Sequence, residues 1–187
     1  LGINKIGTLE FDSKRKMMST LVSGFSKENS KSLLQKGATE RIIDLCSTIM
    51  LGDGKIVEFT KKHKDSLKTQ FNRVAGQGLR CIGLAAIFDG GELSKVTDQN
   101  KNSMLSDFDS YGRYESGGTF LGGAAIKDPL REQVPPSIQK CKEAGIRVIM
   151  ITGDNKNTAE AIGRRIGLFT EDEDVTGRSY TGREFDD

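Results

Sequence analysis

The chain has 187 residues, which is enough for one sizeable domain or two small ones. Its 28 Lys and Arg and 26 Asp and Glu residues are interspersed and leave a net charge of +2, which argues against nucleic-acid binding, because such proteins concentrate their basic residues on one face. No run approaches the roughly 18 to 20 apolar residues needed to span a bilayer, and the three widely spaced cysteines fit no metal-binding pattern and suggest reduced thiols.

The first half of the chain alternates strand-like and helix-like patterns. Thr39 is expected to cap a helix that runs to about residue 50, and Thr60 to cap a second helix that ends at Gly76 and Gly78. Gly52 to Gly54 form an expected turn. Strands are expected at residues 8–11, 17–23, 32–36, 55–58 and 79–88.

The second half begins with a polar stretch, residues 89–118, which is typical of a connection or a family-variable insertion. A strand at 119–126, a helix at 131–144, a strand at 147–151 and a helix at 158–166 are expected to follow. Periodicity alone predicts that residues 119–151 form a single βαβ unit. The alternating pattern indicates an α/β or α+β fold.

Two segments near the beginning have the chemistry of a nucleotide site. Phe11 ends a strand directly before Lys14, Arg15 and Lys16, and an aromatic face beside cations suits a purine above phosphates. The alternative is a core phenylalanine beside a solvated turn. Lys36 precedes a glycine, Gly37, that allows close approach of backbone to a ligand, although a surface lysine before a turn would look the same.

Two later segments have the chemistry of an anion site. Arg80 interrupts an apolar strand and therefore needs a carboxylate, a phosphate or an edge position facing solvent. Thr152, Gly153 and Asp154 join an expected strand to a helix, where backbone N–H groups favour anions, unless Asp154 is only a helix cap. Asp128–Pro129 has the composition of a plain turn.

Five motifs occur in the order seen in P-type ATPases, so the chain resembles this family along essentially its whole length. Residues 171–175 and 181–185 look most like the reticulum-type calcium pumps. The five motifs are TLEFDSKRKMMS (8–19), KGATE (36–40), LRC (79–81), KDPLR (127–131) and AGIRVIMITGDN (144–155).

The resemblance implies a role for each of these segments. Phe11 would stack on adenine, and Arg80 would contact the phosphates. Asp128–Pro129 would lie at an interdomain hinge. The nucleotide pocket would also be lined by Ser13, Lys16, Lys36 and Gly37. The catalytic residues that meet the transferred phosphoryl group would be Thr152, Gly153 and Asp154.

The resemblance also implies a fold: an antiparallel sheet flanked by helices, with a partial haloacid-dehalogenase-like segment. Residues 1–127 would be the C-terminal part of a nucleotide-binding domain, and residues 128–187 an incomplete phosphorylation domain. Two positions depart from the family. Ser13 stands where the reticulum pumps commonly carry Arg, so Lys14 could substitute for that phosphate contact, and Thr39 replaces a proline.

The implied parent uses ATP and Mg²⁺ to move calcium, and its partners are its own phosphorylation, actuator and transmembrane domains. Its cytosolic face would lie at an endoplasmic or sarcoplasmic reticulum membrane. The chain lacks the family's phosphorylated Asp-Lys-Thr-Gly-Thr motif, so we expect a fragment that binds nucleotide without turning it over, and no metal ligands. The alternatives are a pump for sodium/potassium or protons, a non-enzymatic nucleotide module, a dehalogenase-like phosphatase, and a protein-interaction module on residues 89–118.

Overall fold

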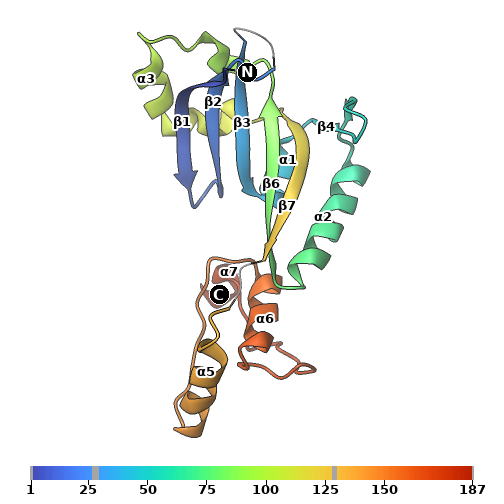
Figure 1. The fold of residues 1–187 in the computed structure, drawn as a ribbon, viewed down its shortest axis with the longest axis vertical. Coiled ribbons are helices and arrows are strands. Elements are labelled where there is room, and N and C mark those ends of the chain that lie inside the picture. Colours follow the sequence, from blue (N-terminus) through green and yellow to red (C-terminus); the bar gives the residue numbers. More distant parts are fainter. Residues whose placement is uncertain (1, 27–29, 128–129, 187) are drawn as a thin grey trace. The chain divides into compact units, whose positions relative to one another are not determined.

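The computed structural model describes residues 2–26, 30–127 and 130–186, so the expected turn or hinge at Asp128–Pro129 lies outside the described residues. The chain forms two compact units (Figure 1). The first contains Leu1–Thr69 and Cys81–Ala124, and the second contains Gln70–Arg80 and Ala125–Asp187. The expected domain boundary after residue 127 stays a prediction.

The strands form one seven-stranded sheet with the order β1-β2-β3-β6-β7-β4-β5. Four ladders are antiparallel (β1–β2, β2–β3, β3–β6 and β4–β5), whereas β4 pairs in parallel with β7, so the sheet is mixed. The strands are β1 (Asn4–Asp12), β2 (Met17–Ser23), β3 (Lys31–Ala38), β4 (Thr48–Met50), β5 (Ile56–Glu58), β6 (Leu79–Ile87) and β7 (Thr119–Lys127).

The helices flank this sheet and fill the second unit, which confirms the expected α+β class. None of the described helices is long and apolar enough to cross a bilayer. The α-helices are α1 (Thr39–Leu45), α2 (Lys61–Ala75), α3 (Lys101–Ser106), α4 (Tyr111–Tyr114), α5 (Val134–Glu143), α6 (Lys156–Arg165) and α7 (Gly182–Asp186), and the 3-10 helices are η1 (Gly91–Lys95) and η2 (Phe108–Ser110).

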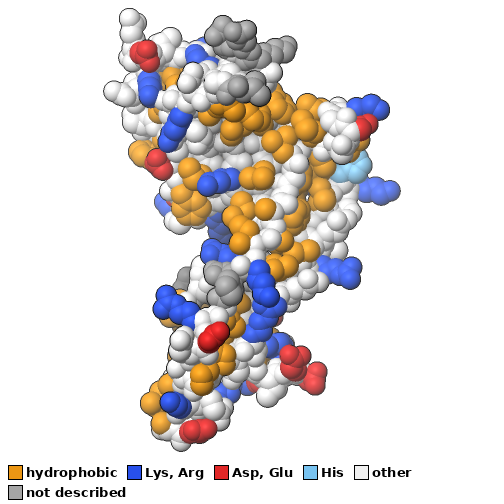
Figure 2. All heavy atoms as spheres, viewed as in Figure 1, with side chains coloured by type: hydrophobic (Ala, Val, Ile, Leu, Met, Phe, Trp, Pro, Cys, Tyr) orange, Lys and Arg blue, Asp and Glu red, His pale blue; other side chains and the backbone are white. Residues whose placement is uncertain are grey.

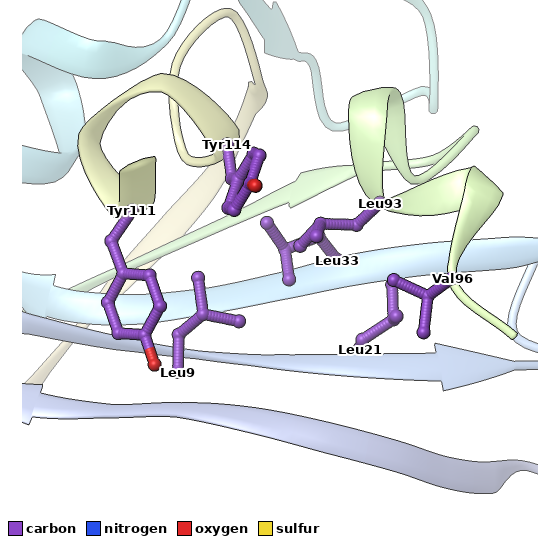
Figure 3. Close-up of a cluster of buried hydrophobic side chains, with 7 residues drawn as sticks. All are labelled: Leu9, Leu21, Leu33, Leu93, Val96, Tyr111 and Tyr114. Carbon is purple, nitrogen blue, oxygen red and sulfur yellow. The ribbon is translucent and has the colours of Figure 1, made fainter. Parts of the chain in front are cut away.

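The largest buried cluster lies between the first three strands and the segment that follows β6. Leu9, Leu21 and Leu33 come from β1, β2 and β3 and are fully buried, because alternate residues of neighbouring strands point to one face of the sheet. They pack against residues from η1 to α4, namely Leu93, Val96, Tyr111 and Tyr114 (Figure 3).

The expectation that residues 89–118 form a mere connection is therefore wrong. Apolar and aromatic side chains recur within this polar stretch, and the 3-10 and short α-helices bring them together over β1 to β3 (Figure 1). Its polar composition reflects the outer surface of these short helices. This segment covers one face of the sheet.

The first predicted helix is shorter than expected. It ends at Leu45, because Thr48–Met50 pairs instead with β5 and β7 as a strand. Thr39 does not cap it: the capping position is Ala38, and the Thr39 side chain is buried. The cap expected at Thr60 is confirmed, since its Oγ1 accepts a hydrogen bond from the His63 N–H at 3.4 Å.

The second unit packs the end of α2 against α6, where Thr158 Oγ1 donates to the Ala75 carbonyl oxygen at 3.5 Å.

The strand expected at 147–151 is not formed. A strand that is apolar on both faces needs neighbouring strands and cover on both sides, and the described part of this unit supplies neither. Ile149 and Ile151 are 72% and 93% exposed. The βαβ unit expected from periodicity alone is therefore wrong, and β7 joins the main sheet, as the resemblance to the family implies for this strand.

Candidate functional site

The hairpin of β1 and β2 carries the aromatic residue of the predicted site. Leu9 pairs with Ser19 and Asp12 pairs with Met17, so two residues of β1, Glu10 and Phe11, stand opposite the single residue Met18. This two-against-one arrangement is a β-bulge, a device that redirects a side chain at the end of a ladder. The Phe11 side chain is 63% exposed, so it is not an ordinary core residue.

Lys36 lies on the same face as Met18. The ladders pair Met18 with Lys36, and Lys36 with Leu84 of β6, and directly paired residues share one face of a sheet. We call Phe11, Met18, Lys36 and Leu84 the exposed strip. Phe11, Lys36 and Leu84 are exposed and Met18 is half-buried.

The exposed strip lies on the face opposite the buried leucine cluster, because Ser19 and Gln35, which neighbour Met18 and Lys36 in sequence, point into the buried side. In Figure 1 the yellow part of the segment that follows β6 lies behind β1 and β2, and α3 is drawn beside β1. Figure 2 shows the near face, with hydrophobic side chains spread over these strands and Lys and Arg side chains among them.

The turn between β1 and β2 is held by its own backbone and by Asp12. The Asp12 carboxylate accepts hydrogen bonds from the Lys14 and Arg15 N–H groups at 3.0 and 3.3 Å, and the first of these contributes most to lowering the pKa of Asp12. The Lys16 N–H donates to the Asp12 carbonyl oxygen at 2.7 Å. Ser13 and Lys14 are exposed in this turn.

Lys16 has an unusual backbone conformation. Among the described residues it is the one non-glycine residue with a positive φ, 55°. This left-handed conformation costs on the order of 1 kcal/mol for a residue with a Cβ. Such conformations are enriched at functional sites, so the backbone of Lys16 supports its place in the candidate site. The Lys16 carbonyl oxygen accepts a hydrogen bond from the Ala38 N–H at 2.9 Å, which ties the turn to the end of β3 two residues after Lys36.

Arg15 differs from its two lysine neighbours. Its side chain is only 12% exposed, and its Nη1 donates to both carboxylate oxygens of the buried Glu115 at 2.6 Å. Arg15 is therefore occupied within the protein, and the cations left on the surface of this turn are Lys14 and Lys16.

The second unit contains the other predicted residues. Arg80 Nε lies 3.3 Å from Asp154 Oδ1, and the Arg80 side chain is 57% exposed. Of the alternatives expected for Arg80, the structure therefore shows a carboxylate partner and a side chain that faces solvent. The Thr152 hydroxyl donates to Asp154 Oδ2 at 3.2 Å and accepts from the Asp154 N–H at 3.1 Å. A Cβ added at Gly153 would meet no atom within 4 Å, so packing within this structure does not demand a glycine there.

The reading of Asp154 as a helix cap is wrong. The capping residue of α6 is Asn155, whose side-chain oxygen accepts a hydrogen bond from the Thr158 N–H at 2.9 Å. Asp154 interacts instead with Arg80 and Thr152, and it lies two residues before α6 begins at Lys156.

Chemically, the exposed strip offers an aromatic ring, a thioether and an aliphatic side chain beside ammonium groups. These groups suit a ligand with a flat apolar ring and a negatively charged chain. The described residues contain no group of three or more His, Cys, Asp and Glu side chains that could hold a metal ion. Sequence reasoning missed Met18 and Leu84, although strand alternation from Lys36 could have placed them once the register was known.

A hollow of the first unit lies elsewhere. It is lined by Ser26, Met50, Ile56 and Phe88, among other residues, near the start of β3 rather than near Lys36 at its end. No residue of the exposed strip lines it.

Comparison with known proteins gives consistent matches. Residues 2–133 match the family model described as P-type ATPase, cytoplasmic domain N. The chain is 43% identical over 182 residues to the endoplasmic reticulum calcium ATPase srcA of Aspergillus fumigatus, covering 97% of this chain and 18% of that protein. It is 42% identical over 183 residues to calcium-transporting ATPase 2, endoplasmic reticulum-type, of Arabidopsis thaliana, covering 97% of this chain and 17% of that protein.

A third relative is a probable calcium-transporting ATPase of Trypanosoma brucei brucei, 38% identical over 188 residues, which cover 97% of this chain and 18% of the relative. The chain thus spans less than a fifth of the length of these curated relatives. The family model covers more than two thirds of the chain, including the whole seven-stranded sheet. The chain therefore belongs to the P-type cation-transporting ATPase family, and residues 2–133 correspond to its cytoplasmic domain N.

Proposed function

We propose that this chain is the ATP-binding cytosolic portion of a P-type pump that couples ATP hydrolysis to calcium transport across a reticulum membrane. The calcium specificity and the membrane come from the names of the relatives, which are endoplasmic reticulum calcium pumps. The chain's own part in this activity is to bind the nucleotide. The remaining domains of the pump are its partners.

The observation that carries the proposal is the exposed strip. Phe11 is 63% exposed in a bulge opposite Met18, and Met18 pairs directly with the exposed Lys36. Leaving a phenylalanine ring in water forgoes roughly 1.5 to 3 kcal/mol of burial free energy, so a ligand that covers it gains that contribution. Adenine would stack on Phe11, and Lys16 and Lys36 would balance phosphate charge.

The second unit has a separate role in this proposal. Thr152, Gly153 and Asp154 would meet the transferred phosphoryl group, as the resemblance implies for this motif. Arg80 would contact the phosphates. The hydrogen bonds between Thr152 and Asp154 support this role, because they preorganise both side chains before the start of α6. When bound, Mg²⁺ would spread the phosphate charge.

A titration of the chain with a fluorescent ATP analogue tests the nucleotide site. Lys36→Glu reverses a charge next to the phosphates, so we expect the dissociation constant to rise at least tenfold, or about 1.4 kcal/mol. Phe11→Ala removes the stacking surface and should cost about 1 to 3 kcal/mol. Unchanged affinity in both variants would contradict the site.

The matched control is Lys62→Glu. Lys62 is an exposed lysine on α2, which follows β5 at the opposite edge of the sheet from β1. The same charge reversal there should leave the dissociation constant within twofold. If Lys36→Glu and Lys62→Glu raised the dissociation constant equally, the affinity would depend only on the net charge of the chain.

A further inference from the structure

The structure assigns a positioning role to Glu115, acting with Arg15: this pair holds the residues of the proposed nucleotide site in place from the opposite face of the sheet. The inference rests on the proposed function. Glu115 lies at the end of the segment that follows β6, directly after α4, and is 1% exposed. Its polar partners lie on the buried face of the sheet, opposite the exposed strip, so it acts through its neighbours.

Three polar contacts connect Glu115 to three different parts of the site. Its carboxylate accepts from Arg15 Nη1 at 2.6 Å and from the Ser19 hydroxyl at 2.6 Å. Its backbone carbonyl oxygen accepts from Gln35 Nε2 at 2.8 Å. These partners belong to the turn after β1, to β2 and to β3.

Each partner is the sequence neighbour of a residue of the proposed site. Arg15 precedes Lys16, Ser19 follows Met18, and Gln35 precedes Lys36. Because side chains alternate along a strand, Ser19 and Gln35 point into the buried face exactly where their neighbours point outward. Fixing the buried side chains therefore fixes the backbone from which Met18 and Lys36 project.

Arg15 extends this support to Phe11 and Lys16. Its Nη2 donates to the carbonyl oxygen of Glu10, which belongs to the peptide bond between Glu10 and Phe11 in the bulge. Its guanidinium lies 4.8 Å from the ring centre of Tyr111, and the backbone N–H of Arg15 donates to the Asp12 carboxylate. The turn that holds Lys16 at a positive φ is thus tied to Glu115 by a nearly buried ion pair.

Such a pair is sensitive to the loss of one member, since the other charge is then left without its partner in a dry environment. Glu115→Gln keeps the size and one of the two acceptor oxygens but removes the charge. We expect it to raise the dissociation constant for the fluorescent ATP analogue about fivefold while the protein stays folded, as judged by circular dichroism.

A double-variant cycle separates positioning from general stability. If Glu115 acts through the turn, its effect should shrink in the Lys16→Asn background, because asparagine tolerates a positive φ and the cation to be positioned is gone. The fold-change caused by Glu115→Gln should then fall from about five to about two to three, which is the share carried by the hydrogen bond from Ser19. An unchanged fold-change in that background would overturn the positioning role.

Glu92→Gln is the matched control, because Glu92 lies in the same segment and pairs with Arg113 at 3.1 Å on the exposed surface. It should leave the affinity unchanged. If Glu115→Gln fails to fold, Ser19→Ala removes one hydrogen bond to Glu115 and should weaken binding about twofold to threefold. If the unmodified chain fails to bind nucleotide, the proposed function and this inference are both overturned. If the unmodified chain binds and the folded variant, Glu115→Gln or Ser19→Ala, binds equally well, only the inference is overturned.

Discussion

Gly37 and Met17 lie so close together in the β2–β3 ladder that the backbone and Cβ of Met17 occupy the space of a side chain at position 37. A Cβ built on Gly37 would lie 2.5 Å from the Met17 Cβ and 2.6 Å from the Lys16 carbonyl oxygen. Packing between the strands therefore explains this glycine. Its contact with a ligand remains a proposal.

Gly37→Ala should destabilise the chain by about 1 to 3 kcal/mol, because the added methyl group meets backbone atoms that cannot move aside easily. Urea unfolding followed by circular dichroism measures the change. Gly52→Ala is the control, since a Cβ there would meet nothing within 4 Å. Equal stability of the two variants would contradict the close approach of β2 and β3.

Leu93→Ala tests whether the segment after β6 is part of the core. Leu93 is fully buried against the leucines of β1 to β3, so its truncation should cost about 2 to 5 kcal/mol of unfolding free energy. Lys95→Ala, at an exposed position in the same 3-10 helix, should change stability by less than about 0.5 kcal/mol. A small effect at Leu93 would restore the interpretation of this segment as a loose connection.

Cys46 should resist alkylation in the folded chain. It is 2% exposed, and burial raises the pKa of its thiol to about 12, so the reactive thiolate is scarce at pH 8. Mass spectrometry after brief iodoacetamide treatment should show Cys46 unmodified in native protein and modified in urea. Rapid labelling of native Cys46 would show that α1 and its surroundings open readily.

Asp12 gives the turn between β1 and β2 a dependence on pH. Hydrogen bonds from the Lys14 and Arg15 backbone hold its pKa below the usual 3.8, so the folded state favours the carboxylate. This contribution to stability is present above about pH 4 and is lost as the pH falls through the lowered value. Carboxyl chemical shifts measured by NMR should give an Asp12 pKa below 3.8.

Asp12→Asn is the companion variant. The Lys14 and Arg15 N–H groups donate to different oxygens of Asp12, and asparagine has only one acceptor oxygen, so the variant keeps one of these two hydrogen bonds. Asparagine does not titrate, so the amide resonances of Lys14 and Arg15 should no longer shift between pH 5 and pH 2. Persistence of that shift in the variant would assign the titration to another group.

Sequence patterns predicted most elements of the first unit, because local signals and tertiary packing agree there. The β1–β2 hairpin, the cap at Thr60 and the apolar strand β6 follow from alternation, capping chemistry and composition. The first helix was predicted too long because Thr48–Met50 continues a helical apolar spacing, yet its pairing with two strands outweighs this local preference.

The site was predictable in its residue types but not in its arrangement. Phe11, Lys16 and Lys36 could be named from the sequence, whereas the bulge that sets Phe11 opposite Met18 depends on register. Composition concealed the role of Glu115, since a buried carboxylate in a polar stretch looks like a surface residue until Arg15 and Ser19 are seen beside it.

The central claim is that nucleotide binds over the exposed strip, and NMR mapping tests it most directly. Titration of the isotopically labelled chain with ATP should shift the Met18 methyl resonance and the backbone amides of Phe11 and Lys36 more than those of Ser26, Met50 and Phe88. Saturable shifts confined to the strip and its turn are the predicted result. Shifts that gather instead around Ser26, Met50 and Phe88, or an unchanged spectrum at millimolar ATP, would contradict the account.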